Sequence, residues 1–245
     1  MKKSSVVSVI RRDLRKSRIP GKKEILSRFF KTKKGEYGEG DVFLGVMVPD
    51  CRRVAHEHAS KATLSDCAEL LSSAIHEERL AALLILVRKF KWASREKDEA
   101  MCAKIFDFYL SHTQGINNWD LVDLSAYHIV GAYLRQQKNG LTRLSLLARD
   151  TNMWRRRIGI VATYAYIREG NVAPTFTIAR ILLSDTHDLI HKATGWMLRE
   201  AGKRDRSALE AFLLPHYRQM PRTMLRYAIE KFEPAAREAY LKGRV

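Results

Sequence analysis

The sequence predicts an all-α protein built as an α-solenoid, and three observations support this fold class. Only six prolines and thirteen glycines interrupt the 245 residues. From about residue 63 onward, apolar side chains recur every three or four positions, which is the period of a helix and not of a strand. The helical segments also recur in pairs at a nearly constant interval, and such a repeat is typical of a solenoid.

The first expected element is a helix inside the strongly basic segment 1–34. Packing of Val6, Val9, Ile10 and Leu14 on one face is favoured over a targeting peptide, because the apolar stretch is too short for a signal sequence. The segment holds thirteen Lys and Arg against two acidic residues, so it supplies +11 of the formal net charge of +17. This charge predicts attraction to a polyanion, with nucleic acid favoured over an anionic membrane surface.

Further helices are expected along the rest of the chain, and each begins at a polar or proline-containing turn. About five helix pairs are expected between residues 63 and 240, within a single domain that spans residues 1–245. The clearest helical segments cover residues 75–90, 152–167, 176–184, 186–202, 208–217 and 220–232.

The sequence also excludes several classes of protein. The longest apolar run, Leu80–Val87, is well below the ~20 residues that cross a bilayer, so a soluble cytoplasmic protein without membrane contact is expected. The three cysteines show no metal-ligand spacing and are interpreted as reduced thiols. Nucleotide-binding glycine loops and zinc-binding histidine motifs are absent, so the sequence predicts neither a cofactor nor a metal.

The repeats align on one charged residue in each second helix. These residues are Arg79, Asp123, Arg157, Lys192 and Arg226, with separations of 44, 34, 35 and 34 positions. Stacked second helices are expected to line a concave basic groove, and Asp123 is the acidic exception in this series. The alternative interpretation is that the five charges are solvated residues without a shared role.

The stretch INNWDLVDLSA at 116–126 carries the first candidate functional residues. Asn118 as N-cap and Asp120 in the first turn suit the start of a helix, because they satisfy its exposed amides and its positive end. Asp123 follows Trp119 by four positions, which places both on one face. Helix capping does not explain Asp123. It is expected either to form a buried ion pair with Arg157 of the next repeat or to act as a functional carboxylate.

A second candidate region surrounds Trp196, which lies between Lys192 and Arg199 on a predicted second helix. Aromatic side chains at helical spacing pack in a core more often than they contact a ligand. Basic residues beside an exposed indole would nevertheless suit nucleic acid, because phosphates bind cations and aromatic faces bind sugars or bases.

Four stretches, in order, resemble the DNA alkylation repair proteins of the AlkD type. They are EGDVFLGVMVPDCRRVA (39–55), INNWDLVDLSA (116–126), MWRRRIGIVAT (153–163) and HDLIHKATGWMLREAGKRD (187–205). The resemblance covers the chain from about residue 20 to about residue 240. It implies a DNA glycosylase built of HEAT-like helical repeats.

The resemblance also implies roles for individual residues. The family's catalytic aspartate falls on Asp123, its two lesion-facing tryptophans fall on Trp119 and Trp196, and a nearby arginine falls on Arg157. Together these residues would form a cleft against the DNA backbone. Lys192 and Arg199 are expected as further DNA-binding residues because of their position beside Trp196, and not because of the resemblance.

Two positions depart from the family pattern. Asn118 stands where some members carry a second tryptophan, and Phe29 stands where some carry a tyrosine that faces DNA. Both positions are expected to affect the preferred lesion more than the reaction.

The implied function is base excision repair by a monofunctional glycosylase that acts on double-stranded DNA as a monomer. It would hydrolyse the N-glycosidic bond of cationic N3- or N7-alkylated purines, such as 3-methyladenine and 7-methylguanine. The alternative is a noncatalytic HEAT-like scaffold that binds nucleic acid or a protein, because helical repeats serve both purposes.

Overall fold

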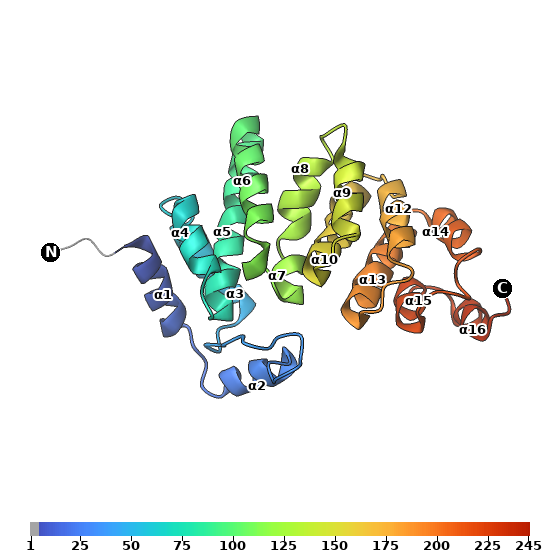
Figure 1. Ribbon diagram of the computed structural model, residues 1–245, viewed down its shortest axis with the longest axis horizontal. Coiled ribbons are helices and arrows are strands. Elements are labelled where there is room, and N and C mark those ends of the chain that lie inside the picture. The colour runs from blue at the N-terminus through green and yellow to red at the C-terminus, as the bar shows by residue number, and fades with distance from the viewer. Residues whose placement is uncertain (1–4) are drawn as a thin grey trace. The chain divides into compact units, whose positions relative to one another are not determined.

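The computed structural model describes residues 5–245, and the regular secondary structure in this range is helical, with no strand (Figure 1). The all-α class is therefore confirmed, and the succession of helices agrees with helical repeats. None of the helices in the described range is long and apolar enough to cross a membrane. Residues 1–4, which include Lys2 and Lys3 of the basic segment, lie outside the described residues.

The contacts divide the chain into two compact units, Met1–Ile129 and Val130–Val245. The boundary falls within the π-helical turn Tyr127–Gly131. The helices of the first unit are α1 (Val6–Lys16), α2 (Lys22–Phe29), α3 (Val48–His58), α4 (Leu64–Leu71), α5 (His76–Arg95), α6 (Glu99–Ser111), the 3-10 turn Thr113–Gly115 and α7 (Trp119–Asp123). Those of the second unit are α8 (Ala132–Leu134), α9 (Gly140–Ala148), α10 (Met153–Ala162), α11 (Tyr164–Arg168), α12 (Ala173–Ile181), α13 (Asp188–Arg204), α14 (Arg206–Leu213), α15 (Arg222–Ala228) and α16 (Pro234–Lys242).

Helix α5 forms the centre of the first unit and packs against α3, α4 and α6 (Figure 1). Every residue of the apolar run Leu80–Val87 is buried. A helix that is apolar on all sides has to be enclosed by other helices. The same property explains why the longest apolar run of the sequence lies at the centre of this unit.

Helix α1 packs one apolar face against α3, α4 and α5. Its buried residues are Val7, Ile10 and Leu14, whereas Val6 and Val9 are only half-buried. The sequence pattern predicts Val6 and Val9 in the packed face as well. The structure instead uses positions separated by three and four residues, which lie on one side of a helix.

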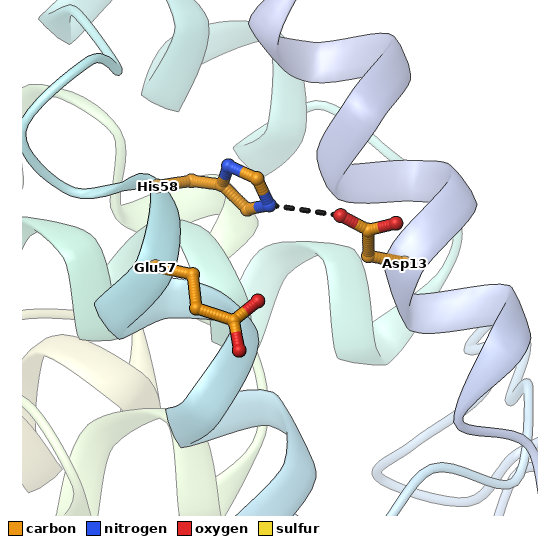
Figure 2. Close-up of side chains that lie close together, drawn as sticks. All are labelled: Asp13, Glu57 and His58. Carbon is orange, nitrogen blue, oxygen red and sulfur yellow. Dashed lines mark hydrogen bonds and ion pairs between the residues drawn. The ribbon is translucent and has the colours of Figure 1, made fainter.

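A polar contact also joins α1 to α3, as Figure 2 shows. The Nε2 of His58 lies 3.0 Å from Oδ2 of Asp13, and Glu57 lies beside them. Metals bind such groups, but both carboxylates already form ion pairs, Asp13 with Arg12 and Glu57 with Arg53. We interpret the cluster as a connection between the two helices.

Helix α13 is the centre of the second unit and packs against α10, α12, α14 and α15 (Figure 1). Its Gly195 allows a close approach, because a Cβ atom there would lie only 2.5 Å from the carbonyl oxygen of Met224 and from Cβ of Tyr227. The segment predicted as one helix over 152–167 is divided into α10 and α11 at Thr163. The buried hydroxyl of Thr163 donates to the carbonyl of Ile160 at 2.7 Å, a local bond that competes with regular helix geometry.

Candidate functional site

The short helix α7 carries Trp119 at its first position and Asp123 at its last. Asn118 is its N-cap, as the sequence predicts, and its side-chain oxygen accepts from the backbone amide of Trp119 at 2.8 Å. The helix is only five residues long, so its own hydrogen bonds hold it weakly. Its position therefore depends on contacts with the rest of the first unit.

Trp119 packs in a cluster of aromatic rings. Its indole stacks on Phe30, with the ring centroids 5.1 Å apart and the planes 14° apart, and it meets the edge of Phe29 at 5.8 Å. Phe30 is buried and stacks in turn on Phe43 at 5.0 Å. The Phe29 side chain is 61% exposed. The predicted residues Phe29 and Trp119 are therefore in direct contact.

The cluster borders a cavity of about 320 Å³ in the first unit. Asp123 and Trp119 both line it, as their spacing on one helix face predicts. Volumes above ~300 Å³ are typical of small-molecule sites, and such sites combine apolar walls with a few polar groups. The lining is aromatic and aliphatic apart from its ionisable groups, His76, Glu77, Asp120 and Asp123. The cavity thus brings together four predicted or capping residues, Phe29, Trp119, Asp120 and Asp123. It adds two ionisable residues that the sequence did not indicate, His76 and Glu77.

Asp120 does more than begin a helix. It is 5% exposed, and its Oδ1 accepts from the amide of Leu121 at 2.8 Å. Its Oδ2 lies 2.8 Å from Nε2 of His76, a residue 44 positions earlier in the chain. The explanation by helix capping alone was incomplete, because this long-range contact has no local signal around Asp120.

His76 belongs to a buried polar network at the start of α5. Its Nδ1 lies 3.0 Å from Oδ2 of Asp41, and the same oxygen accepts from the side-chain amide of Asn118 at 2.9 Å. Arg79 forms an ion pair with the other oxygen of Asp41 and donates to the carbonyl of Ser73 at 2.8 Å. His76 is 2% exposed and Asp41 8%. The network connects the loop before α3, the start of α5 and α7.

The two partners of His76 determine its charge. Burial opposes a cationic imidazole, but the carboxylates of Asp120 and Asp41 outweigh this effect and raise the pKa of His76 to about 9. Burial also opposes ionisation of Asp41. The hydrogen bonds from His76 and Asn118 and the charge of Arg79 nevertheless lower the pKa of Asp41 below its ordinary value.

Glu77 holds one wall of the cavity. Its buried carboxylate accepts from the backbone amides of Leu44, Gly45 and Val46 at 2.8–3.1 Å. Gly45 has a φ of +91°, a conformation that favours glycine. The carboxylate therefore fixes the loop that supplies Phe43 and Val46 to the lining. One sequence signal could have revealed this role, because HEER (76–79) directly precedes the apolar run and charges there need buried partners.

The other predicted residues lie in the second unit. Arg157 of α10 is 4% exposed and donates from Nη1 to the carbonyl of Leu189, which connects α10 to the first turn of α13. Trp196 is half-buried on α13, with its ring 6.3 Å from that of Tyr164. These surroundings describe how each residue packs within the unit. The expected contacts with DNA stay predictions.

The predicted cations beside Trp196 both have acidic neighbours. Nζ of Lys192 lies 2.9 Å from Asp188, and the Lys192 ammonium lowers the pKa of that carboxyl although burial opposes this. Arg199 pairs with Glu200 and Glu230. The Lys192–Asp188 pair is exposed, and exposed pairs are weak, whereas the side chains of Arg199 and Glu200 are only 18% and 13% exposed.

The five aligned charges do not share one environment. Arg79 and Arg157 are buried, Asp123 and Lys192 are half-buried, and Arg226 is exposed. The five residues therefore occupy recurrent positions in the helices, but they do not form a uniform charged surface.

Comparisons with known proteins point to one family. A family model described as DNA alkylation repair enzyme matches residues 10–232. No curated protein matches the chain. A solved structure, a predicted DNA alkylation repair enzyme from Enterococcus faecalis, is similar with a TM-score of 0.68. The comparison covers 89% of this chain and 98% of that chain at 18% identity, which supports the fold alone. Because the family model spans most of its length, the chain belongs to the DNA alkylation repair enzyme family.

Proposed function

We propose that the protein is a monofunctional DNA glycosylase that releases N3- or N7-alkylated purines from double-stranded DNA. The observation that carries the proposal is the shared cavity of Trp119 and Asp123, an aromatic and acid-lined site in a chain with a net charge of +17. Membership of the alkylation repair family supports a substrate in damaged DNA. Basic residues elsewhere would bind the DNA backbone, while the carboxylate would face the lesion.

The chemistry of the substrate explains why one carboxylate would suffice. A purine alkylated at a ring nitrogen is cationic and leaves as a neutral base, so no general acid has to protonate it. The sugar becomes positively charged as the N-glycosidic bond breaks. In the proposed reaction Asp123 stabilises this oxocarbenium ion and positions, or deprotonates, the attacking water. The products are the free base and an abasic site.

Aromatic rings would assist the same step. The indole of Trp119 offers an electron-rich face, and an aromatic face stabilises a nearby cation by about 0.5–2 kcal/mol. In the second unit, Trp196 is proposed to contact the lesion. Arg157, Lys192 and Arg199 are proposed to contact the surrounding DNA backbone. No cofactor or metal takes part in this scheme.

The decisive experiment measures release of 7-methylguanine from methylated DNA without added metal or nucleotide. We expect Asp123→Asn to abolish release while the DNA affinity and the melting temperature stay close to those of the wild type. Asp98→Asn is the matched control, because it makes the same chemical change at an exposed N-cap where asparagine also caps. This variant should release base at the wild-type rate.

Other outcomes would contradict the proposal. If Asp123→Asn released base at the wild-type rate, Asp123 would not be the catalytic residue. Unfolding of this variant would favour a structural ion pair instead. A wild-type protein that binds DNA but releases no base would support the noncatalytic scaffold.

Light scattering coupled to gel filtration, with and without DNA, would test the expected monomer.

A further inference from the structure

We propose that His76 is a positioning residue for the proposed glycosylase: a cationic imidazole, held between Asp41 and Asp120, that fixes the helix carrying Trp119 and Asp123. The inference rests on the proposed function for its catalytic consequence. Its structural part, the dependence of α7 on His76, is testable independently of any activity.

The contacts of the imidazole place it between two elements. Nδ1 faces Asp41 of the loop before α3 at 3.0 Å, and Nε2 faces Asp120 of α7 at 2.8 Å. The ring also stacks on Phe43 at 4.5 Å and lies 5.0 Å from Phe30, which itself stacks on Trp119. His76 thus contacts α7 through a polar bond and through an aromatic neighbour of Trp119.

The geometry also indicates that the imidazole is charged. A neutral histidine has one N–H and one lone pair, so it can donate to only one of two ionised carboxylates. Here both ring nitrogens face carboxylate oxygens within 3.0 Å. An imidazolium donates in both directions, whereas a neutral ring would oppose one lone pair to another inside a buried site.

The charges around His76 come from each of the elements that surround it. Asp41 lies on the loop, Asp120 on α7, and Arg79 and Glu77 on α5 itself. The two carboxylates raise the pKa of His76, while burial and the cation Arg79 oppose them. Arg79 also bonds to Asp41, so the positive charges and the carboxylates alternate along the network.

This network determines where α7 lies. Asn118 and Asp120 flank Trp119, and both belong to the network. Asn118 bonds to Asp41, and Asp120 bonds to His76. A helix of five residues has little stability of its own. The bonds at Asn118 and Asp120 therefore decide how Trp119 and Asp123 are presented to the cavity. The cation also balances the charge of Asp120, three positions before the proposed catalytic carboxylate.

The first test measures hydrogen exchange of the backbone amides in residues 117–124 of the full-length protein. We expect His76→Gln to increase their exchange about tenfold or more. The matched control is His58→Gln, which removes a histidine–aspartate contact elsewhere in the unit, the one with Asp13 between α1 and α3 (Figure 2). It should leave residues 117–124 protected. Unchanged exchange in His76→Gln would overturn the inference.

The second test measures release of 7-methylguanine under single-turnover conditions. We expect the rate to fall about tenfold or more in His76→Gln, with little change in DNA affinity, because small displacements of reacting groups are costly. If His76→Gln does not fold, Asp41→Asn takes its place as the test variant. It removes the charge of one carboxylate with little change in shape, and it should lower the rate of base release by less than tenfold. A wild-type rate in either folded variant would overturn the catalytic consequence. If the wild type releases no base but exchange changes as expected, the proposed function fails and the positioning of α7 stands.

The third test separates a charged histidine from a packing residue. A group whose pKa rises from 6.5 to about 9 on folding stabilises the protein fully below pH 6.5, and the effect is lost as the pH rises through 9. We therefore expect the difference in melting temperature between wild type and His76→Gln to shrink steadily from pH 6.5 to above pH 9. A difference that is the same at every pH would overturn the cationic assignment.

Discussion

Asp120 and Asp123 lie three positions apart on the same short helix but have different environments. Asp120 is buried and bonded to Leu121 and His76. Asp123 is half-buried and lines the cavity with Trp119. At the scale of single residues, the structure thus assigns one carboxylate to the internal network and places the other where a ligand could meet it.

This difference predicts that the same substitution lowers stability at Asp120 and activity at Asp123. Asp120→Asn should lower the free energy of unfolding by about 2 kcal/mol, because it removes the charge from a buried bond to a cation while the amide can still accept. Asp123→Asn should change stability far less and abolish base release. Urea unfolding of both variants near neutral pH measures the first effect. Equal reductions in stability would contradict the distinction.

At the scale of elements, each unit is built around one long helix. Helix α5 is buried along its apolar run, and its charged first turn holds the loop before α3 and the helix α7. Helix α13 carries Lys192, Trp196 and Arg199, and it approaches α15 closely at Gly195. The placement of the candidate residues in both units therefore depends on how neighbouring helices pack against α5 and α13.

The contact between α13 and α15 is expected to tolerate no side chain at Gly195. A Cβ atom there would lie 2.5 Å from two atoms of α15, so Gly195→Ala should force the helices apart and cost about 1–3 kcal/mol. Gly159→Ala on α10 is the comparison, because its nearest neighbour would lie at 3.1 Å. Its overlap is offset by a gain in helix propensity of about 1 kcal/mol. Thermal unfolding should show a clear destabilisation for Gly195→Ala and little change for Gly159→Ala.

At the scale of the whole molecule, the positive charge is concentrated near the N-terminus, but part of it has a structural role. Arg11 and Arg15 of α1 pair with Glu78, whose side chain is 1% exposed. The bond to Glu78 is the main reason that the pKa of Arg11 is raised, although burial opposes it. Neutralising these arginines would leave a buried carboxylate without its cations. The exposed lysines of residues 22–34 are better suited to test binding.

Replacing Lys23, Lys33 and Lys34 by glutamine should weaken the salt dependence of DNA binding. Each lysine that binds a phosphate contributes about −0.9 to the slope of log K against log salt concentration, so removing three such lysines makes the slope less negative by about 2.7. The control replaces Lys203, Lys231 and Lys242, which are exposed and pair with glutamates. An unchanged slope in the first variant would remove residues 22–34 from the interface.

Local sequence patterns were sufficient for the helical class, for the cap at Asn118 and for the shared face of Trp119 and Asp123. These features depend on residues one to four positions apart, and helix geometry alone relates such positions. The break at Thr163 and the limited burial of Val6 and Val9 were not predicted. They depend on a single side-chain bond and on which face of α1 meets its neighbours.

The sequence by itself determined that the chain is helical, that its charge is concentrated near the N-terminus, and that Asp123 accompanies Trp119. Only the tertiary structure decided that His76 joins Asp41 to Asp120, which are 35 and 44 positions away. It likewise decided that Phe30 stacks on Trp119 beside the cavity. Contacts over such separations arise when helices pack around a common core, and no local periodicity specifies which buried polar groups then meet.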